Sequence, residues 1–91
     1  MKQSLIIGQD GRGGTIYYDN SYGSISFYWE FGGGDCIAII FLPTDAEWRS
    51  AFGAAAERKD QFLEYIGAEI IRQKAPGCQA RVNGQWLEIF K

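Results

Sequence analysis

The chain of 91 residues contains no histidine, and this absence excludes several kinds of site. Nucleophilic catalysis by a Ser–His or Cys–His pair needs an imidazole base, which this sequence does not have. The only two cysteines, Cys36 and Cys78, cannot supply the four ligands of the usual structural zinc site. We therefore predict no metal site and assign no catalytic residue.

Basic charge and long apolar runs are also scarce. Nine Lys and Arg are scattered among eleven Asp and Glu, whereas binding to nucleic-acid phosphates needs a concentration of basic residues. The longest apolar run, Cys36 to Leu42, is far shorter than the ~20 residues that span a bilayer. No basic start followed by a long apolar segment marks a signal peptide. We predict a cytoplasmic protein that binds neither nucleic acid nor membranes.

The two cysteines are expected to be free because the cytoplasm is reducing. Cys36 opens the longest apolar run, and Cys78 follows the segment with helical periodicity that comes after that run. A helical segment that begins where a strand ends returns the chain toward the start of that strand. We therefore expect both cysteines at one end of the sheet, near each other but reduced.

The densest apolar content lies in Ser24 to Leu42. In its first part, four apolar side chains alternate with four others, and this period of two indicates a half-buried strand. One set is Ile25, Phe27, Trp29 and Phe31, and the other is Ser24, Ser26, Tyr28 and Glu30. The unbroken apolar run from Cys36 to Leu42 is typical of a strand covered on both faces. Ser24 to Leu42 is therefore predicted to form a central hairpin.

Shorter segments on both sides of this hairpin predict four more strands. They are Ser4 to Ile7, Thr15 to Asp19, Gln79 to Val82 and Gln85 to Phe90. Short turns rich in glycine separate the first four strands of the chain, as in an antiparallel meander. Asn83-Gly84 predicts a two-residue type I′ turn between the last two strands.

Helical periodicity follows the central hairpin. Thr44 and Glu47 form the T-x-x-E pattern of a capping box, and apolar residues then recur every three or four positions. One unbroken helix would be ~46 Å long, about twice the ~23 Å of the strand before it, so half of its apolar face would be left in water. We predict a break between Gly53 and Lys59 and a second helix that ends at Lys74.

Together these segments predict a single α+β domain, residues 1–91, in the order ββββααββ. A mostly antiparallel sheet of about six strands carries the broken helix on one face. The glycine-rich segment Gly8 to Gly14 has the composition of a phosphate-binding loop, but such loops lie between a strand and a helix. Here a second strand follows, so we predict a mobile hairpin turn and no bound cofactor.

The sheet face away from the helix carries the candidate binding residues. They are Tyr17, Tyr28, Glu30, Trp86 and Glu88, with Phe90 as a further aromatic candidate. Exposed aromatic side chains among a few charges are what protein interfaces favour, although cross-strand pairing alone would also account for them. Our leading prediction is a non-catalytic protein–protein interaction module that uses this face. An inhibitor- or immunity-like role is one form of it, by analogy with other small domains.

Two further possibilities stay open. Tyr28, Glu30 and Glu88 in a shallow pocket would suit a small enzyme or ligand-binding domain, since two carboxylates ~5 to 9 Å apart can act on a glycoside. A flat face would count against this possibility. Alternatively, a second copy of the chain would cover the apolar second face of the run Cys36 to Leu42, which gives a homodimer.

Overall fold

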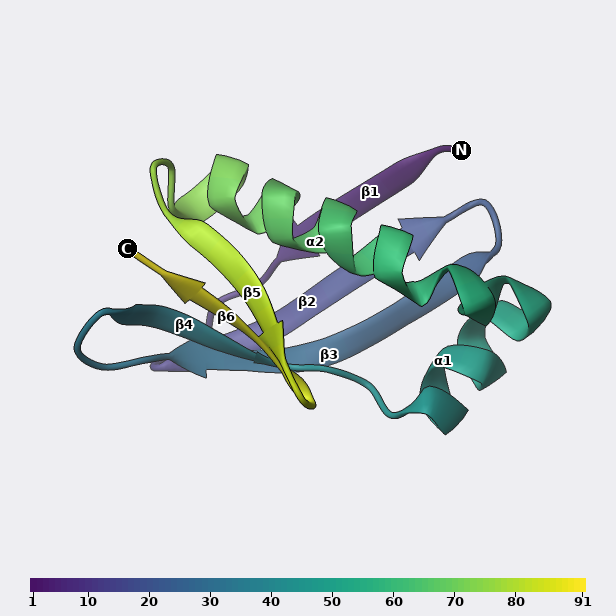
Figure 1. Cartoon of the computed structure of the whole chain (residues 1–91), viewed down its shortest axis with the longest axis horizontal. Helices are drawn as coiled ribbons and strands as arrows, with labels where there is room; N and C mark the ends of the chain where they lie inside the picture. The colour runs from purple at the N-terminus through teal and green to yellow at the C-terminus, as the bar shows by residue number, and fades with distance from the viewer.

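The computed structural model describes residues 1–91 and shows one sheet with the helices across one of its faces (Figure 1). The strands are β1 (Gln3–Ile7), β2 (Gly13–Asn20), β3 (Gly23–Phe31), β4 (Cys36–Phe41), β5 (Gln79–Asn83) and β6 (Trp86–Phe90). The helical segments are α1 (Asp45–Phe52), the 3₁₀ segment η1 (Gly53–Arg58) and α2 (Lys59–Lys74). The predicted α+β class, element order and broken helix are confirmed.

All neighbouring strands are antiparallel, and their order across the sheet is β1-β2-β3-β4-β6-β5. The first four strands form the predicted meander. After the helices the chain enters β5 at the far edge, and β6 then turns back into the place beside β4. This insertion brings the C-terminal strand next to the most apolar strand of the sheet, with Trp86 opposite Phe41.

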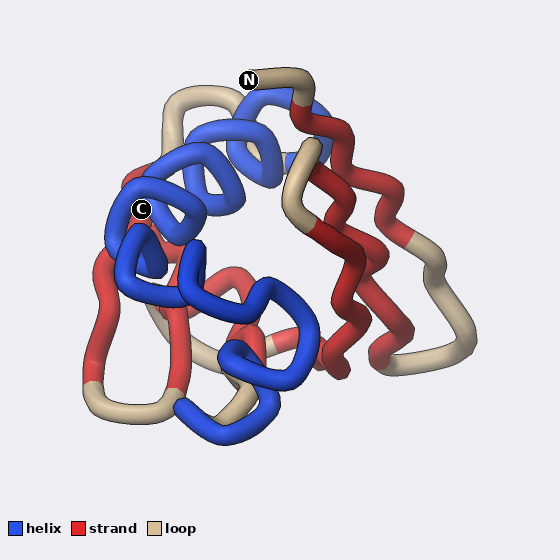
Figure 2. Tube along the Cα trace, turned by 90° about the vertical axis from the view of Figure 1, so that its right-hand side faces the viewer, coloured by secondary structure: helices blue, strands red, loops and turns tan.

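The core lies between the sheet and the helices and is rich in aromatic rings. Tyr18, Trp48, Phe52 and Phe62 are almost fully buried, and the ring centroids of the contacting pairs are 5.1 to 6.4 Å apart. Such pairs add stabilisation beyond the burial of their area. α2 contacts β1 at one edge of the sheet and β5 and β6 toward the other. The sheet thus curves around α2 (Figure 2).

The predicted break of the helix is confirmed between α1 and α2. Gly53 has φ 60° and ψ −135°, a backbone conformation that side chains with a Cβ rarely adopt. Lys59 falls inside the apolar stripe, and its Nζ lies 2.9 Å from an Asp45 carboxylate oxygen at the joint. At the start of α1, the Glu47 amide donates to the Thr44 hydroxyl and the Thr44 amide donates to the Glu47 carboxylate. The predicted capping box is therefore present.

The last hairpin differs from its prediction by one residue. Asn83 belongs to β5 and faces Trp86, so the two loop residues are Gly84 and Gln85. Gly84 has φ 63°, and no residue other than glycine has a positive φ. A type I′ turn needs positive φ at both central residues, whereas type II′ needs it only at the first. The predicted I′ turn at Asn83-Gly84 is therefore wrong, and the φ pattern is that of a type II′ turn.

Cys36 and Cys78 are free and lie at the same end of the sheet, as predicted. They are not neighbours, however. Cys36 faces Phe90 of β6, and Phe90 faces Gln79, the residue after Cys78. Because β6 lies between them, two strand spacings, roughly 10 Å, separate the two backbones. This exceeds the ~7 Å limit for a disulfide, so the expectation of close cysteines is corrected.

Candidate functional site

The candidate site is the sheet face that carries no helix, which we call the outer face. Side chains alternate between the two faces along each strand, so the neighbours of the buried positions point outward. All four charged residues of the strands lie on it: Asp19, Glu30, Arg81 and Glu88. Three of the predicted residues lie there with about half of their surface exposed: Tyr17, Tyr28 and Trp86.

Three rings lie side by side on neighbouring strands of the outer face, and we call them the aromatic row: Tyr28 of β3, Phe41 of β4 and Trp86 of β6. The rings of Tyr28 and Phe41 stack, with centroids 5.7 Å apart and an interplanar angle of 22°. Phe41 meets Trp86 edge-on, at 6.3 Å and 80°. Both arrangements are favoured for aromatic pairs. Phe41 is half-buried, so it supports the two more exposed rings on either side of it.

A glycine in β2 makes room for the first ring of the aromatic row. A Cβ at Gly13 would lie 2.7 Å from the Tyr28 hydroxyl oxygen and 2.4 Å from the Trp29 carbonyl oxygen. Gly13 is itself buried because the Tyr28 ring reaches over it. Tyr28 is therefore placed by Phe41 on one side and by the bare backbone of β2 on the other.

The two predicted glutamates lie in the next row across the sheet. Glu30 and Glu88 both face Ile39, one from each side, so their backbones are about 10 Å apart. Glu88 is engaged: the Asn83 amide donates to its Oε1 at 3.0 Å, and the Arg81 guanidinium lies 3.6 Å from the same oxygen. Glu30 forms no ion pair. None of the four main pockets is lined by either glutamate.

Tyr17 stands apart from the aromatic row. It faces Ile6 of β1 and Ser26 of β3, and the Ile6 side chain is 61% exposed. Phe90, the further aromatic candidate, is half-buried under the Arg81 guanidinium, whose carbon lies 4.6 Å from the ring centroid. The five predicted residues thus do not form one cluster. Tyr28 and Trp86 lie in the aromatic row, Glu30 and Glu88 lie in the next row, and Tyr17 lies apart from both.

Phe41 is the outer-face residue that sequence reasoning missed. It joins Tyr28 to Trp86, yet it belongs to a run that is apolar on both faces, so no alternation singled it out. A second feature was also missed. An apolar pocket of about 220 Å³ lies on the opposite side of the sheet, between β1, β2, β3, β4 and β6 and the end of α2. Its lining residues come from six elements that only the tertiary fold brings together.

Comparisons with protein-family models, with curated proteins and with solved structures found no match. No group of three or more metal-ligating side chains is close enough to hold an ion. Neither helix is long and apolar enough to cross a membrane. The outer face and the pocket behind it are therefore the two features of this protein that bear on its function.

Proposed function

We propose that this protein is a non-catalytic protein-binding module whose outer face contacts another protein. The observation that carries the proposal is the aromatic row, in which two rings held by a third leave about half of their surface in water. Tyrosine and tryptophan dominate the binding energy of many interfaces because they bury a large area at a small entropic cost.

Cross-strand pairing alone does not account for the exposure of these rings. Pairing stabilises a sheet through the surfaces that the rings share, and it leaves their outer surfaces in contact with water. A binding role accounts for this exposure.

The charge of the outer face favours a basic partner over a second copy of this chain. The strands place three carboxylates there, those of Asp19, Glu30 and Glu88, against the one guanidinium of Arg81. In a symmetric dimer through this face, two surfaces of net negative charge would face each other, which disfavours the contact. A partner with Lys or Arg around an apolar patch would complement it.

An inhibitor- or immunity-like protein is one form that this role can take, since such proteins act by stoichiometric contact. A cytoplasmic location is part of this proposal, and two free thiols are compatible with it. The enzyme alternative has less support, because neither glutamate lines any of the four main pockets.

The first test compares capture of partners by Trp86→Ala with capture by the parent protein. Trp86 is 44% exposed at the end of the aromatic row, so its truncation removes contact area without opening the core. We expect at least a ~30-fold loss in affinity for the captured protein, equivalent to the ~2 kcal/mol of a hot-spot residue. Glu64→Ala on the exposed side of α2 is the matched control and should bind as the parent does.

Two results would contradict the proposal. One is a folded Trp86→Ala variant, checked by circular dichroism, that captures the same protein with unchanged affinity. The other is a dimer of the parent protein in sedimentation equilibrium that Trp86→Ala converts to a monomer, which would assign the outer face to self-association.

A further inference from the structure

The pocket behind the sheet is a second feature with the character of a binding site. Ten of its twelve lining residues are hydrophobic, and its volume is about 220 Å³. The sheet supplies the floor, including Ile16, Trp29 and Ile40. Ile70 of α2 and Ala75, directly after α2, supply the roof. Pockets that bind small molecules are mostly apolar, with a few polar groups at defined places.

The polar groups of this pocket lie at its mouth. Lys74 and Gln9 are its two non-hydrophobic lining residues, and both are exposed. Lys74 forms no ion pair within the chain, so its ammonium is available to a ligand. Phe31 also lies at this end, 44% exposed, with its ring edge-on to Trp29 at 4.9 Å. The site therefore offers an apolar interior and one positive charge at its opening.

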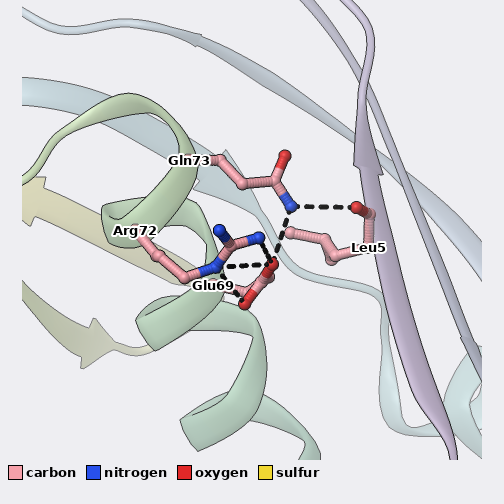
Figure 3. Close-up of polar contacts among 4 residues, drawn as sticks. All are labelled: Leu5, Glu69, Arg72 and Gln73. Carbon is pink, nitrogen blue, oxygen red and sulfur yellow. Dashed lines mark hydrogen bonds and ion pairs between the residues drawn. The ribbon is translucent and has the colours of Figure 1, made fainter.

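The walls of the pocket are held by two polar contacts. The Trp29 indole donates to the Gly8 carbonyl at 2.9 Å, which fixes the ring in the floor. The Gln73 amide donates to the Leu5 carbonyl at 3.0 Å and thereby ties the end of α2 to β1 (Figure 3). A pocket that is preformed costs a ligand less ordering when it binds.

We propose that this pocket binds a small apolar carboxylate, with its hydrocarbon or aromatic part inside and its carboxylate at Lys74. The size follows from the volume: a cavity of ~150 Å³ holds benzene, so about 220 Å³ holds roughly nine non-hydrogen atoms. An apolar interior of this kind does not hold ordered water well, so an apolar group is the occupant that it favours. A carboxylate is favoured over an amine because the Lys74 ammonium is positively charged.

This site is independent of the proposed protein interface, because it lies on the other side of the sheet from the aromatic row. Trp86→Ala should therefore leave ligand binding unchanged. The failure of one proposal would not entail the failure of the other.

Calorimetric titration with three matched probes tests the proposal. Phenylpropanoate, phenylpropanol and phenylpropylamine share one apolar part and differ in charge. We expect the carboxylate to bind most tightly and the amine most weakly. Lys74→Gln should weaken binding of the carboxylate by up to about fivefold, as for an exposed ion pair, and should not change binding of the alcohol. Lys2→Gln, an exposed lysine before β1, is the control.

Filling the pocket tests the place of binding. Ala38 lines the floor, so Ala38→Leu puts three extra carbons into the space and should abolish binding of all three probes. If that variant does not fold, nuclear Overhauser effects between the phenyl protons of bound phenylpropanoate and the Ile16 and Ile40 methyl groups of the parent protein locate the probe instead. The proposal is overturned by absence of binding at millimolar concentration, by equal affinity for carboxylate and amine, or by a folded Ala38→Leu variant that still binds.

Discussion

Glu69 illustrates how single residues hold the helix to the sheet. Its carboxylate accepts hydrogen bonds from Arg72 and from Gln73, and Gln73 also reaches the β1 backbone (Figure 3). These bonds, above all that from Arg72, lower the pKa of Glu69 to about 2. The charged carboxylate is thus favoured in the folded state, and it lies in the network that closes the helix against an edge strand.

The pH dependence of stability follows from this pKa. Because the folded pKa lies below the unfolded value, Glu69 contributes stability above about pH 4.5, and the contribution is lost as the pH falls toward 2. We expect Glu69→Gln to flatten the decline in the free energy of unfolding over this range, measured by urea denaturation. Glu64→Gln, which removes an exposed carboxylate of α2 without an ion pair, is the matched control. Equal slopes for all three proteins would contradict the assignment.

At the residue scale, the period of two assigned Tyr28 and Trp86 to the face away from the helices. The same reasoning could not identify Phe41. In a run that is apolar on both faces, no alternation shows which side chains lie on the outer face. Nor could it show that Glu88 is engaged by Asn83 and Arg81, since these contacts depend on the register between β5 and β6.

At the scale of elements, the helix break could be predicted because it follows from lengths. A helix longer than the sheet it covers must turn, and Gly53 supplies the backbone conformation for the turn. The last hairpin could not be placed to the residue, because Asn-Gly signals a tight turn without fixing which pair of residues forms it. Here the pairing of Asn83 with Trp86 moves the turn to Gly84 and Gln85.

The role of Gly53 gives a prediction at this scale. Gly53→Ala puts a Cβ on a backbone with φ 60°, and we expect the free energy of unfolding to fall by about 1–3 kcal/mol. Gly33→Ala is the matched control: its added Cβ meets nothing within 4 Å, and its φ is not in the left-handed region. Chemical denaturation should separate the two variants. A Gly53→Ala variant as stable as Gly33→Ala would show that the joint between α1 and α2 does not depend on glycine.

At the scale of the whole molecule, the order of the strands in the sheet could not be predicted from the sequence. Turn residues predict that strands adjacent in the sequence pair with each other, but no short stretch of sequence indicates that β6 pairs with β4. That pairing creates both candidate sites: it brings Trp86 beside Phe41 on the outer face, and it brings Ile89 into the floor of the pocket behind it. The pocket in addition requires the curvature of the sheet around α2 (Figure 2).

The net acidity of the outer face predicts how binding should respond to salt. Charged groups on an interface steer encounter, and salt screens them, so association with a basic partner should slow as ionic strength rises. Glu30→Gln removes one of the two carboxylates of the face that form no ion pair and should reduce this salt dependence. The rate of association measured by surface plasmon resonance at low and high salt tests both expectations. Salt-independent association would contradict a basic partner.

The most direct test of the central claim is site-specific photocrosslinking from the aromatic row. A benzophenone amino acid in place of Trp86 keeps an aromatic side chain at the end of the row, and the same group in place of Glu64 samples the opposite, helical side. We predict that position 86 crosslinks one other protein in cells, that excess parent protein competes the product away, and that position 64 gives none of it. The same product from both positions, or only a dimer of this chain, would contradict the claim.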